Sequence, residues 1–368
     1  MNEKVKIGIV GCGNVSGIYF ANLTQNFKNT QIIACTDLDM ERARGAAEKY
    51  NISSALTLEE IFDNKEIQII VNLTIPGAHF EICKKALLSG KHTYVEKTLS
   101  ITCEQGIELV KLAQEKKLML GCAPDTFLGA GIQTCRRILD SGIVGEPIAA
   151  TAFFAHHGPE RFHPDPEFLY KTGAGPLFDM GPYYLTALVS LLGPAKVVSG
   201  MSSTAFKERT ITSEKKYGQK ISVETATHIS GTIKFADNVI ASITTSFDIW
   251  AHRLPFIEIY CKNGTICVPD PNRYCGPVYI QTQYEESFKE IPLINCYSEN
   301  SRGLGVADMA NCIYTGRKNR ANGEMANHVL EIMNALFESS ETHTYVELKT
   351  NCQRPEPFPI GVVKGFVE

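Results

Sequence analysis

The chain has 368 residues, of which 44% are hydrophobic and 21% charged, and its formal net charge is -4. This length exceeds the size at which one hydrophobic core usually stops growing, so we expect two domains. The composition is that of a folded globular protein, and the lack of a basic excess or a basic cluster argues against a nucleic-acid partner.

The twelve cysteines are scattered between Cys12 and Cys352 without a CxxC pair. This spacing indicates free thiols rather than a disulfide framework or a zinc site. The N-terminus shows no signal-peptide pattern, and no stretch approaches the roughly 18 apolar residues of a membrane span. We therefore expect a cytoplasmic protein with no membrane partner and no bound metal.

Short apolar strands alternate with helices in the first third of the chain. We predict strands at 5–10, 31–36, 67–73, 92–95 and 119–122, and helices at 15–26, 40–50, 78–89 and 103–116. Continuous apolar strands separated by helices are typical of a parallel sheet that is covered on both faces. The pattern therefore predicts an α/β Rossmann domain with a doubly wound sheet over residues 1–123.

The pattern changes after Pro124. We predict a helix at 132–141, strands at 147–156, 196–204, 223–235, 239–250 and 256–261, and a late helix at 323–339. Strands joined without helices indicate an α+β domain with a large, open, mostly antiparallel sheet, over residues 124–368. The connection at 158–182 is rich in Gly, Pro and His and is long enough to be a functional loop.

A glycine-rich turn joins the first predicted strand to the first helix. Its pattern is G-x-G-x-x-S, formed by Gly11, Gly13 and Ser16. Gly11 permits the tight turn, Gly13 leaves room for a pyrophosphate, and the small Ser16 lets helix and strand approach. Asp37 ends the second predicted strand, where it could bind both ribose hydroxyls of NAD or instead cap the next helix. We expect NAD, and NADP stays open because Arg42 is near.

Three further segments resemble one family of oxidoreductases. The stretches 72–79 and 90–98 are similar to the "TP…H…GKHV…EKP" pattern of the glucose-fructose oxidoreductase, inositol dehydrogenase and rhizopine catabolism (Gfo/Idh/MocA) family. Residues 173–183 are similar to the "GGGxLxDxGxH" signature of its second domain. The "DMGPYY" variant and the "HGPE…HPDP" loop resemble a subgroup that acts on glycosides, including enzymes that oxidise the 3-hydroxyl of glucosides.

The resemblance implies hydride transfer between a nicotinamide and a secondary alcohol of a sugar or polyol, and homo-oligomers formed through the open sheet. It also implies that Lys97 lies beside the nicotinamide and binds the reacting oxygen, while Asp179 helps to hold substrate and base. The cofactor contacts that we expect are Gly11, Gly13, Asn14, Val15, Asp37, Leu38, Arg42, Thr74, Pro76, His79, Glu96 and Lys97.

Two departures from the family pattern concern the chemistry. Thr98 replaces the usual Pro, and Tyr183 stands at the position of the usual catalytic His. A tyrosine has an ordinary pKa near 10, so it needs a nearby cation to act as a base, and Lys97 with the positive nicotinamide would supply one. We expect Lys97, Asp179 and Tyr183 to be catalytic; alternatively, Tyr183 only donates a hydrogen bond to the substrate.

The long loop offers a second source for the base, because it contains His156, His157 and His163. Their spacing fits no compact metal motif, so we expect them to contact sugar hydroxyls. The substrate contacts that we expect are Asp125, His157, His163, Asp179, Tyr183 and Arg302. Asp125 could instead cap a helix, Arg302 and Asp308 could belong to a solvated turn, and Trp250 could stack on a sugar or merely pack.

The preferred substrate is a glucoside oxidised at its C3 hydroxyl to a 3-keto sugar. Oxidation of inositol or another polyol is the nearest alternative. A glycosidase that recycles NAD within one turnover is a third possibility, and a regulator that binds NAD without catalysis is a fourth. A pure binder would need neither Lys97 nor Asp179, which argues against the last one.

Overall fold

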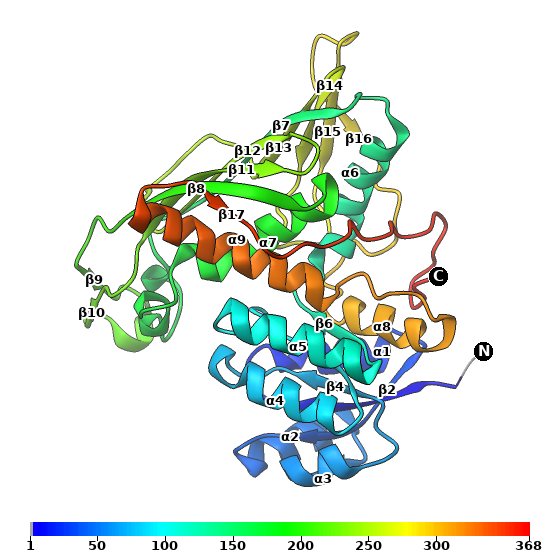
Figure 1. Cartoon of the computed structure of the whole chain (residues 1–368). Helices are drawn as coiled ribbons and strands as arrows, with labels where there is room; N and C mark the ends of the chain where they lie inside the picture. The colour runs from blue at the N-terminus through cyan, green and yellow to red at the C-terminus, as the bar shows by residue number, and fades with distance from the viewer. Residues whose placement is uncertain (1–2) are drawn as a thin grey trace. The chain divides into compact units, whose positions relative to one another are not determined.

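The computed structural model describes residues 3–368, and the chain divides into two compact units (Figure 1). The first unit comprises the chain up to Gln133 together with Ile294–Asn327 and Pro355–Glu368. The second unit comprises Thr134–Leu293 and His328–Arg354. Each unit is described separately below.

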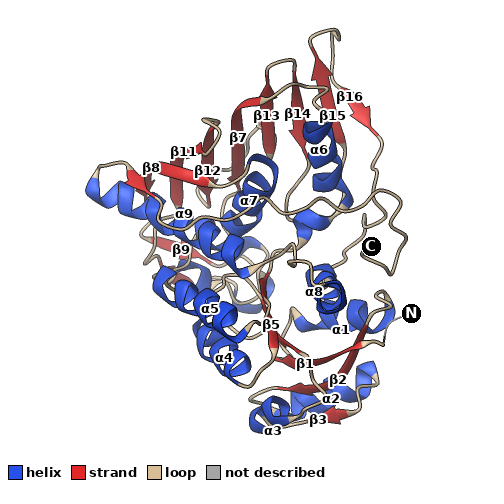
Figure 2. Ribbon diagram, turned by 45° about the vertical axis from the view of Figure 1, so that its right-hand side comes forward, coloured by secondary structure: helices blue, strands red, loops and turns tan. Residues whose placement is uncertain are grey.

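The first unit is built on a six-stranded parallel sheet in the order β3-β2-β1-β4-β5-β6 (Figure 2). The strands are β1 (Val5–Val10), β2 (Thr30–Thr36), β3 (Ser54–Ala55), β4 (Ile69–Asn72), β5 (His92–Val95) and β6 (Leu120–Cys122). Chain order runs outward in opposite directions from β1 and β4, so a topological switch point lies between these two strands. This topology confirms the predicted Rossmann fold.

Helices connect these strands and complete the parallel crossovers. They are α1 (Ser16–Gln25), α2 (Met40–Tyr50), α3 (Leu58–Asp63), α4 (Pro76–Leu88) and α5 (Cys103–Lys116). Side-chain caps begin three of them: Asp39 accepts from Glu41 N in α2, Thr57 forms a capping box in α3, and Thr102 accepts from Gln105 N in α5. The apolar faces of α4 and α5 bury Cys83, Leu87 and Leu109 against β5 and β6, which fixes the strand ends of the sheet.

The second unit is built on a nine-stranded sheet in the order β16-β15-β14-β13-β7-β12-β11-β8-β17. Its strands are β7 (Pro147–Ala155), β8 (Ala195–Ser203), β11 (His228–Phe235), β12 (Ile240–Ser246), β13 (Ile257–Cys261), β14 (Gly264–Val268), β15 (Val278–Thr282), β16 (Lys289–Ile291) and β17 (Val346–Glu347). Only the pair β7 and β12 is parallel, which confirms the predicted mostly antiparallel sheet. A separate hairpin joins β9 (Glu208–Thr210) to β10 (Lys220–Ser222).

The stretch predicted as a loop at 158–182 is partly helical. Two short 3₁₀ helices lie at Pro159–Arg161 and Glu167–Tyr170, and α7 (Pro176–Leu192) begins inside the stretch. Proline suits the first position of a helix because the N–H it lacks there would have no helical partner. Gly and Pro favour a loop locally, so the sequence pattern does not predict this helix start. The helix also contains a second proline, Pro182.

Two segments of the predicted second domain, residues 124–368, belong to the first unit. Ile294–Asn327 contains α8 (Leu304–Thr315), and Asn322 pairs with Gly121 beside β6. Pro355–Glu368 is the second segment. The contact between Gly121 and Asn322 joins residues about 200 positions apart in the sequence. Local periodicity does not indicate such a distant contact.

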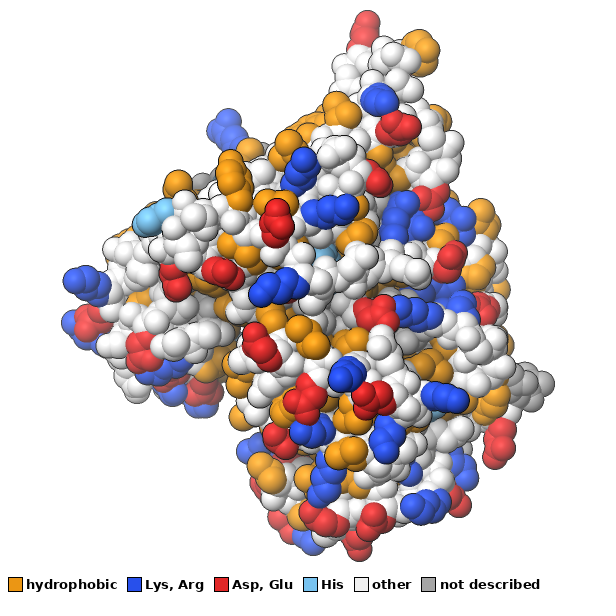
Figure 3. All heavy atoms as spheres, in the orientation of Figure 1, with side chains coloured by type: hydrophobic (Ala, Val, Ile, Leu, Met, Phe, Trp, Pro, Cys, Tyr) orange, Lys and Arg blue, Asp and Glu red, His pale blue; other side chains and the backbone are white. Residues whose placement is uncertain are grey.

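Membrane helices, cysteines, metal clusters and surface charge were also considered in the sequence. Within residues 3–368, no helix is long and apolar enough to cross a membrane. The twelve cysteines are free thiols, and the same described residues contain no His, Cys, Asp and Glu cluster suited to a metal ion. On the face shown in Figure 3, Lys and Arg side chains are interspersed with Asp and Glu.

Candidate active site

The predicted phosphate turn lies at the carboxyl end of β1. Gly11 has a φ of +98°, and a Cβ at this residue would lie 2.9 Å from the carbonyl carbon and oxygen of Leu73. A Cβ on Gly13 would meet no atom within 4 Å, so this position faces open space. Ser16 Oγ donates to Gly13 O at 2.7 Å and ties the turn to the start of α1. The fold therefore requires glycine at Gly11, because of its backbone conformation and the close approach of Leu73, whereas at Gly13 the space is open to a ligand.

The predicted ribose-binding carboxylate is held by the same turn. Cys12 N donates to Asp37 Oδ2 at 2.7 Å, and Asp39 N donates to Asp37 Oδ1 at 2.9 Å. The helix α2 is capped by Asp39, so Asp37 does not serve as that cap. Leu38 is fully exposed beside it, and Arg42 pairs with Asp39 at 3.3 Å while its side chain stays largely exposed.

The segment after β4 contains Thr74, Pro76 and His79. Pro76 is exposed and begins α4, whereas His79 is fully buried in that helix. The ring nitrogens of His79 lie 2.6 Å from Thr98 O and 3.0 Å from Thr74 O. Burial lowers the pKa of His79, so the neutral ring donates its one N–H to one of these carbonyls. His79 thus links the segment after β4 to the segment after β5.

Glu96 and Lys97 follow β5 at the carboxyl edge of the sheet. Tyr19, which is fully buried, donates through its hydroxyl to Glu96 Oε1 at 2.7 Å. The N–H of Lys97 donates to Glu96 Oε2 at 3.0 Å, and the Lys97–Thr98 peptide bond is cis. Burial, together with the charge of Glu96, raises the pKa of Tyr19 well above its ordinary value, so Tyr19 remains a neutral donor.

Helix α7 presents Asp179 and Tyr183 in the second unit. The two residues are four positions apart, so they lie one above the other on the same helix face. Both are half-buried, while Gly181, Pro182 and Tyr184 between and beside them are buried. Asp179 lies in the first turn, where the positive end of the helix dipole stabilises a carboxylate.

His156 is the loop histidine whose pKa is affected by the charge of Asp179. Burial lowers the pKa of His156, and the negative charge of Asp179 opposes that shift. The ring is stacked on Phe247 with centroids 5.1 Å apart and packs edge-on against Phe154 and Phe162. The structure therefore brings a neutral histidine into the electrostatic reach of one of the predicted catalytic residues.

The other two loop histidines are engaged by the protein itself. His157 is stacked on Trp250 at 3.5 Å, and its Nδ1 faces Asp248 O at 3.4 Å. The Nδ1 of His163 accepts from Asp165 N at 3.0 Å, which leaves only its Nε2 for a ligand. Neither contact tests a substrate role.

The predicted substrate residues of the first unit have structural partners. Asp125 is buried, and its Oδ2 accepts from Gly303 N at 3.0 Å and Gly305 N at 2.9 Å, so it caps the distant helix α8 rather than its own segment. Arg302 is half-buried and donates to Asn300 Oδ1 at 3.0 Å. Asp308 is not in a solvated turn: it is fully buried in α8 and pairs with Arg317 and Arg320.

Three residues that hold predicted site residues were not assigned a role from the sequence. They are Tyr19, which orients Glu96; Asn72, whose Oδ1 accepts from Thr74 Oγ1 at 2.6 Å; and Arg209, whose Nη1 lies 3.5 Å from His157 Nε2. Asn72 directly precedes the motif, so its position was a usable signal. The other two contacts span 77 and 52 residues, and no local pattern indicates them.

The carboxyl edge of the first unit fits a dinucleotide. No side chain caps α1 at Val15, and Asn14 beside this helix start is exposed, so the positive end of the helix dipole faces the turn without a capping group. The space at Gly13 admits a pyrophosphate, and the fixed carboxylate of Asp37 suits a ribose diol. Fold and edge together define a dinucleotide-binding protein.

Family models agree with this class of protein. The model described as "Oxidoreductase family, NAD-binding Rossmann fold" matches residues 5–123, and the GFO/IDH/MocA C-terminal domain model matches residues 132–267. Together they match well over half of the chain, which belongs to the GFO/IDH/MocA family of NAD(P)-dependent oxidoreductases. The predicted enzyme class and the predicted cofactor, NAD, are confirmed.

Individual relatives are distant. The chain is 31% identical to a dTDP-3,4-didehydro-2,6-dideoxy-alpha-D-glucose 3-reductase from Saccharopolyspora spinosa, over 56% of this chain and 61% of that protein. It is 24% identical to a D-glucoside 3-dehydrogenase from Escherichia coli, over 94% of this chain and 98% of that protein. The structure of levoglucosan dehydrogenase with NADH and levoglucosan is similar with a TM-score of 0.80, at 17% identity, over 95% of this chain and all of that one.

Proposed function

We propose that the protein oxidises a secondary hydroxyl of a sugar or glycoside with NAD, and that its preferred substrate is a glucoside oxidised at C3 to a 3-keto sugar. The observation that carries the proposal is that Asp179 and Tyr183, both polar and half-buried, share one face of α7, a mostly buried helix. Two polar side chains on one partly exposed helix face give a sugar a carboxylate and a phenol to contact. The similarity to a D-glucoside 3-dehydrogenase over 94% of the chain supports the substrate.

Lys97, Asp179 and Tyr183 have distinct roles in this proposal. Lys97 binds the reacting oxygen of the sugar, and its positive charge favours the phenolate form of Tyr183. This phenolate takes the proton from the hydroxyl group, and Asp179 orients the substrate. NAD, when bound, accepts the hydride that leaves the same carbon. Two electrons and one proton pass to NAD as hydride, and the second proton passes to Tyr183.

Paired variants on α7 test the role of Tyr183. Tyr183→Phe removes only the hydroxyl, so we expect kcat to fall about 100-fold or more, with KM changed little, as for loss of a general base. Tyr184→Phe is the matched control, because that buried hydroxyl has no hydrogen-bond partner among residues 3–368. Nearly full turnover in Tyr183→Phe would refute the role. Loss of turnover in His157→Ala or His163→Ala would then move the base to the loop.

Lys97→Met tests the role of Lys97. We expect kcat to fall at least 100-fold while NAD still binds, because the NAD contacts at Gly13 and Asp37 are unchanged. NAD binding is measured by calorimetry and turnover by NADH absorbance over a panel of glucosides, free sugars and inositols. Faster turnover on inositols than on any glucoside would replace the substrate proposed here with a polyol.

We also propose that the open face of the nine-stranded sheet forms a homo-oligomer. Buried side chains of the sheet face α7, which contacts β7, β11 and β12. The opposite face presents Met201, 79% exposed, among hydroxyl residues such as Ser230, Thr232 and Thr244. Small side chains on a flat sheet allow close approach of a second copy. Sedimentation should show an oligomer that Thr232→Arg dissociates; a monomeric wild-type protein would contradict it.

A further inference from the structure

Exposed aromatic rings gather in the second unit beside the predicted catalytic helix. Trp250 is 71% exposed, Phe162 68% and Phe206 41%. These three residues, with His157 beneath Trp250, are called the aromatic platform below. His157 is stacked on Trp250 at 3.5 Å and 13° and lies edge-on to Phe206 at 5.7 Å. Phe162 lies edge-on to the neighbouring histidine, His156, at 5.7 Å. Three large exposed rings around two consecutive histidines are unusual for surface side chains without a ligand.

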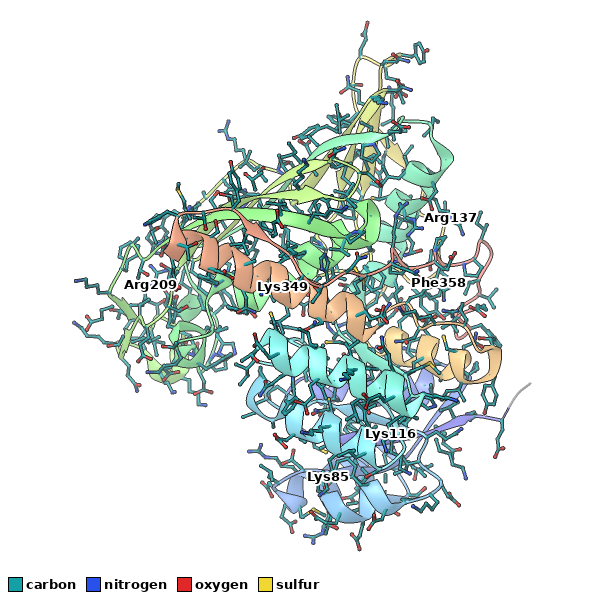
Figure 4. The ribbon with its side chains drawn as sticks, in the orientation of Figure 1. Lys85, Lys116, Arg137, Arg209, Lys349 and Phe358 are labelled. Atoms are coloured by element: carbon teal, nitrogen blue, oxygen red, sulfur yellow. The ribbon has the colours of Figure 1, made fainter. Side chains whose placement is uncertain are left out.

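A buried ionic network holds the platform together. Arg209, labelled in Figure 4, is 4% exposed, and its Nε lies 3.2 Å from Glu160 Oε1. Its Nη2 lies 3.8 Å from Asp248 Oδ1 and also donates to Phe247 O. The loop after β7, the strand β9 and the loop after β12 are thereby joined through one side chain. Burying these charges costs free energy. The network holds in place the loops that carry the exposed aromatic side chains, and a preorganised binding surface requires loops held in this way.

Continuous ring contacts connect the platform to α7. Tyr184, next to Tyr183, lies 5.9 Å from Phe154, and Phe154 lies 5.2 Å from His156. His156 then lies 5.7 Å from Phe162 of the platform. All of these residues belong to the second unit. The charge of Asp179 also acts on His156, so Phe162 of the platform packs against the histidine that adjoins Asp179.

The chemistry of the platform favours a flat apolar ring. Both ring nitrogens of His157 face protein atoms, Asp248 O at 3.4 Å and Arg209 Nη1 at 3.5 Å. Arg161 lies over Trp250 with its guanidinium 5.7 Å from the ring centroid. A second sugar would need several hydrogen-bonding side chains, whereas aromatic faces and a guanidinium plane bind an aryl ring by stacking.

We propose that the aromatic platform binds the aryl aglycone of a glucoside whose sugar is oxidised at Asp179 and Tyr183. This proposal rests on the proposed function for the identity of the sugar. It adds a substrate class, aryl glucosides, and a specificity-determining residue, Trp250.

The single tryptophan makes the platform directly observable, because its fluorescence reports on Trp250 alone. The NAD-loaded protein is titrated with 2-naphthyl β-D-glucoside, with 2-naphthol and with methyl β-D-glucoside. We expect saturable quenching by the two naphthyl compounds and none by the methyl glucoside. Equal quenching by the methyl glucoside, or none by any compound, would overturn the proposal.

Turnover provides the second test. We expect Trp250→Leu to lower kcat/KM for the naphthyl glucoside about tenfold and to change the methyl glucoside less than twofold, as for loss of one stacking contact. Tyr284→Leu is the control, because Tyr284 is an aromatic residue of the same unit and is 88% exposed. An equal loss of kcat/KM on both substrates, or no loss on either, would overturn the proposal. A change in sedimentation mass would also overturn it, because it would show that Trp250 is a subunit contact.

The two proposals can fail separately. If no glucoside reduces NAD but the naphthyl compounds still quench Trp250, the platform is supported and the dehydrogenase activity on glucosides is not. If glucosides are oxidised equally well with and without an aryl group, the activity is supported and the platform is overturned.

Discussion

The backbone N–H of Cys12 donates a hydrogen bond to Oδ2 of Asp37 at 2.7 Å. This bond joins the phosphate turn after β1 to the end of β2, and Asp39 N holds the second carboxylate oxygen at 2.9 Å. The carboxylate is thus oriented before a ribose arrives. Preorganisation of this kind reduces the entropy lost on binding, so Asp37 should contribute strongly to the choice of cofactor.

Replacing Asp37 by serine should weaken NAD binding and relax the discrimination against NADP. A hydrogen bond to a charged group contributes about 1.5–3 kcal/mol, so KM for NAD should rise about 10- to 100-fold. The relative kcat/KM for NADP should rise because the negative charge that repels the extra phosphate is gone. Asp39→Asn is the control, since it removes a charge two positions away but keeps the oxygen that caps α2. An unchanged KM for NAD in Asp37→Ser would contradict the ribose role.

The two glycines of the phosphate turn should respond differently to alanine. A Cβ on Gly13 meets no atom within 4 Å, so Gly13→Ala should keep the melting temperature but lower NAD affinity at least tenfold. Gly11→Ala should unfold at a lower temperature, because its φ of +98° and the 2.9 Å approach to Leu73 together cost about 1–3 kcal/mol. Thermal melts without NAD and calorimetric titration with NAD separate these effects. Equal loss of stability in both variants would show that Gly13 is needed for folding rather than for phosphate.

Much of the first unit could be predicted from local patterns. The helices at 40–50 and 103–116 and the strand at 92–95 have the predicted bounds, because strong periodicity and clear caps mark their ends. The start of α7 at Pro176 was missed, since its Gly and Pro residues favour a turn locally while packing makes them helical. The cap formed by Asp125 on α8 joins residues 178 apart, and only the folded chain reveals it.

His328 should make stability depend on pH. Ala195 N donates to its Nε2 at 2.9 Å, so the buried ring is neutral and its Nδ1 donates to Thr350 Oγ1. Burial lowers its pKa to about 4, below the ordinary value of 6.5, so the unfolded chain binds a proton that the folded chain does not. The free energy of unfolding should therefore fall as pH drops from about 6.5 to 4, by about 3 kcal/mol from this residue. Urea unfolding at several pH values measures it, and His328→Gln should remove most of that slope.

Arg209 should be important for the stability of the second unit. Arg209→Met leaves Glu160 and Asp248 buried without their cation, so the free energy of unfolding should fall by about 3–5 kcal/mol. Lys215→Met is the control: its ion pair with Asp165 is exposed, and its loss should cost less than about 1 kcal/mol. Urea unfolding compares the two variants. Similar small losses in both would show that the buried network is not what orders the loops after β7 and β12.

The most direct test of the account follows the hydrogen at C3 of the sugar. An aryl β-D-glucoside deuterated at C3 is mixed with the protein and NAD, the protein is denatured to release bound cofactor, and cofactor and sugar are analysed by mass spectrometry. The account predicts deuterium in the reduced nicotinamide and a 3-keto product that has lost it. Deuterium that remains at C3 while NADH forms, or no reduced cofactor with any glucoside although NAD binds, would contradict it.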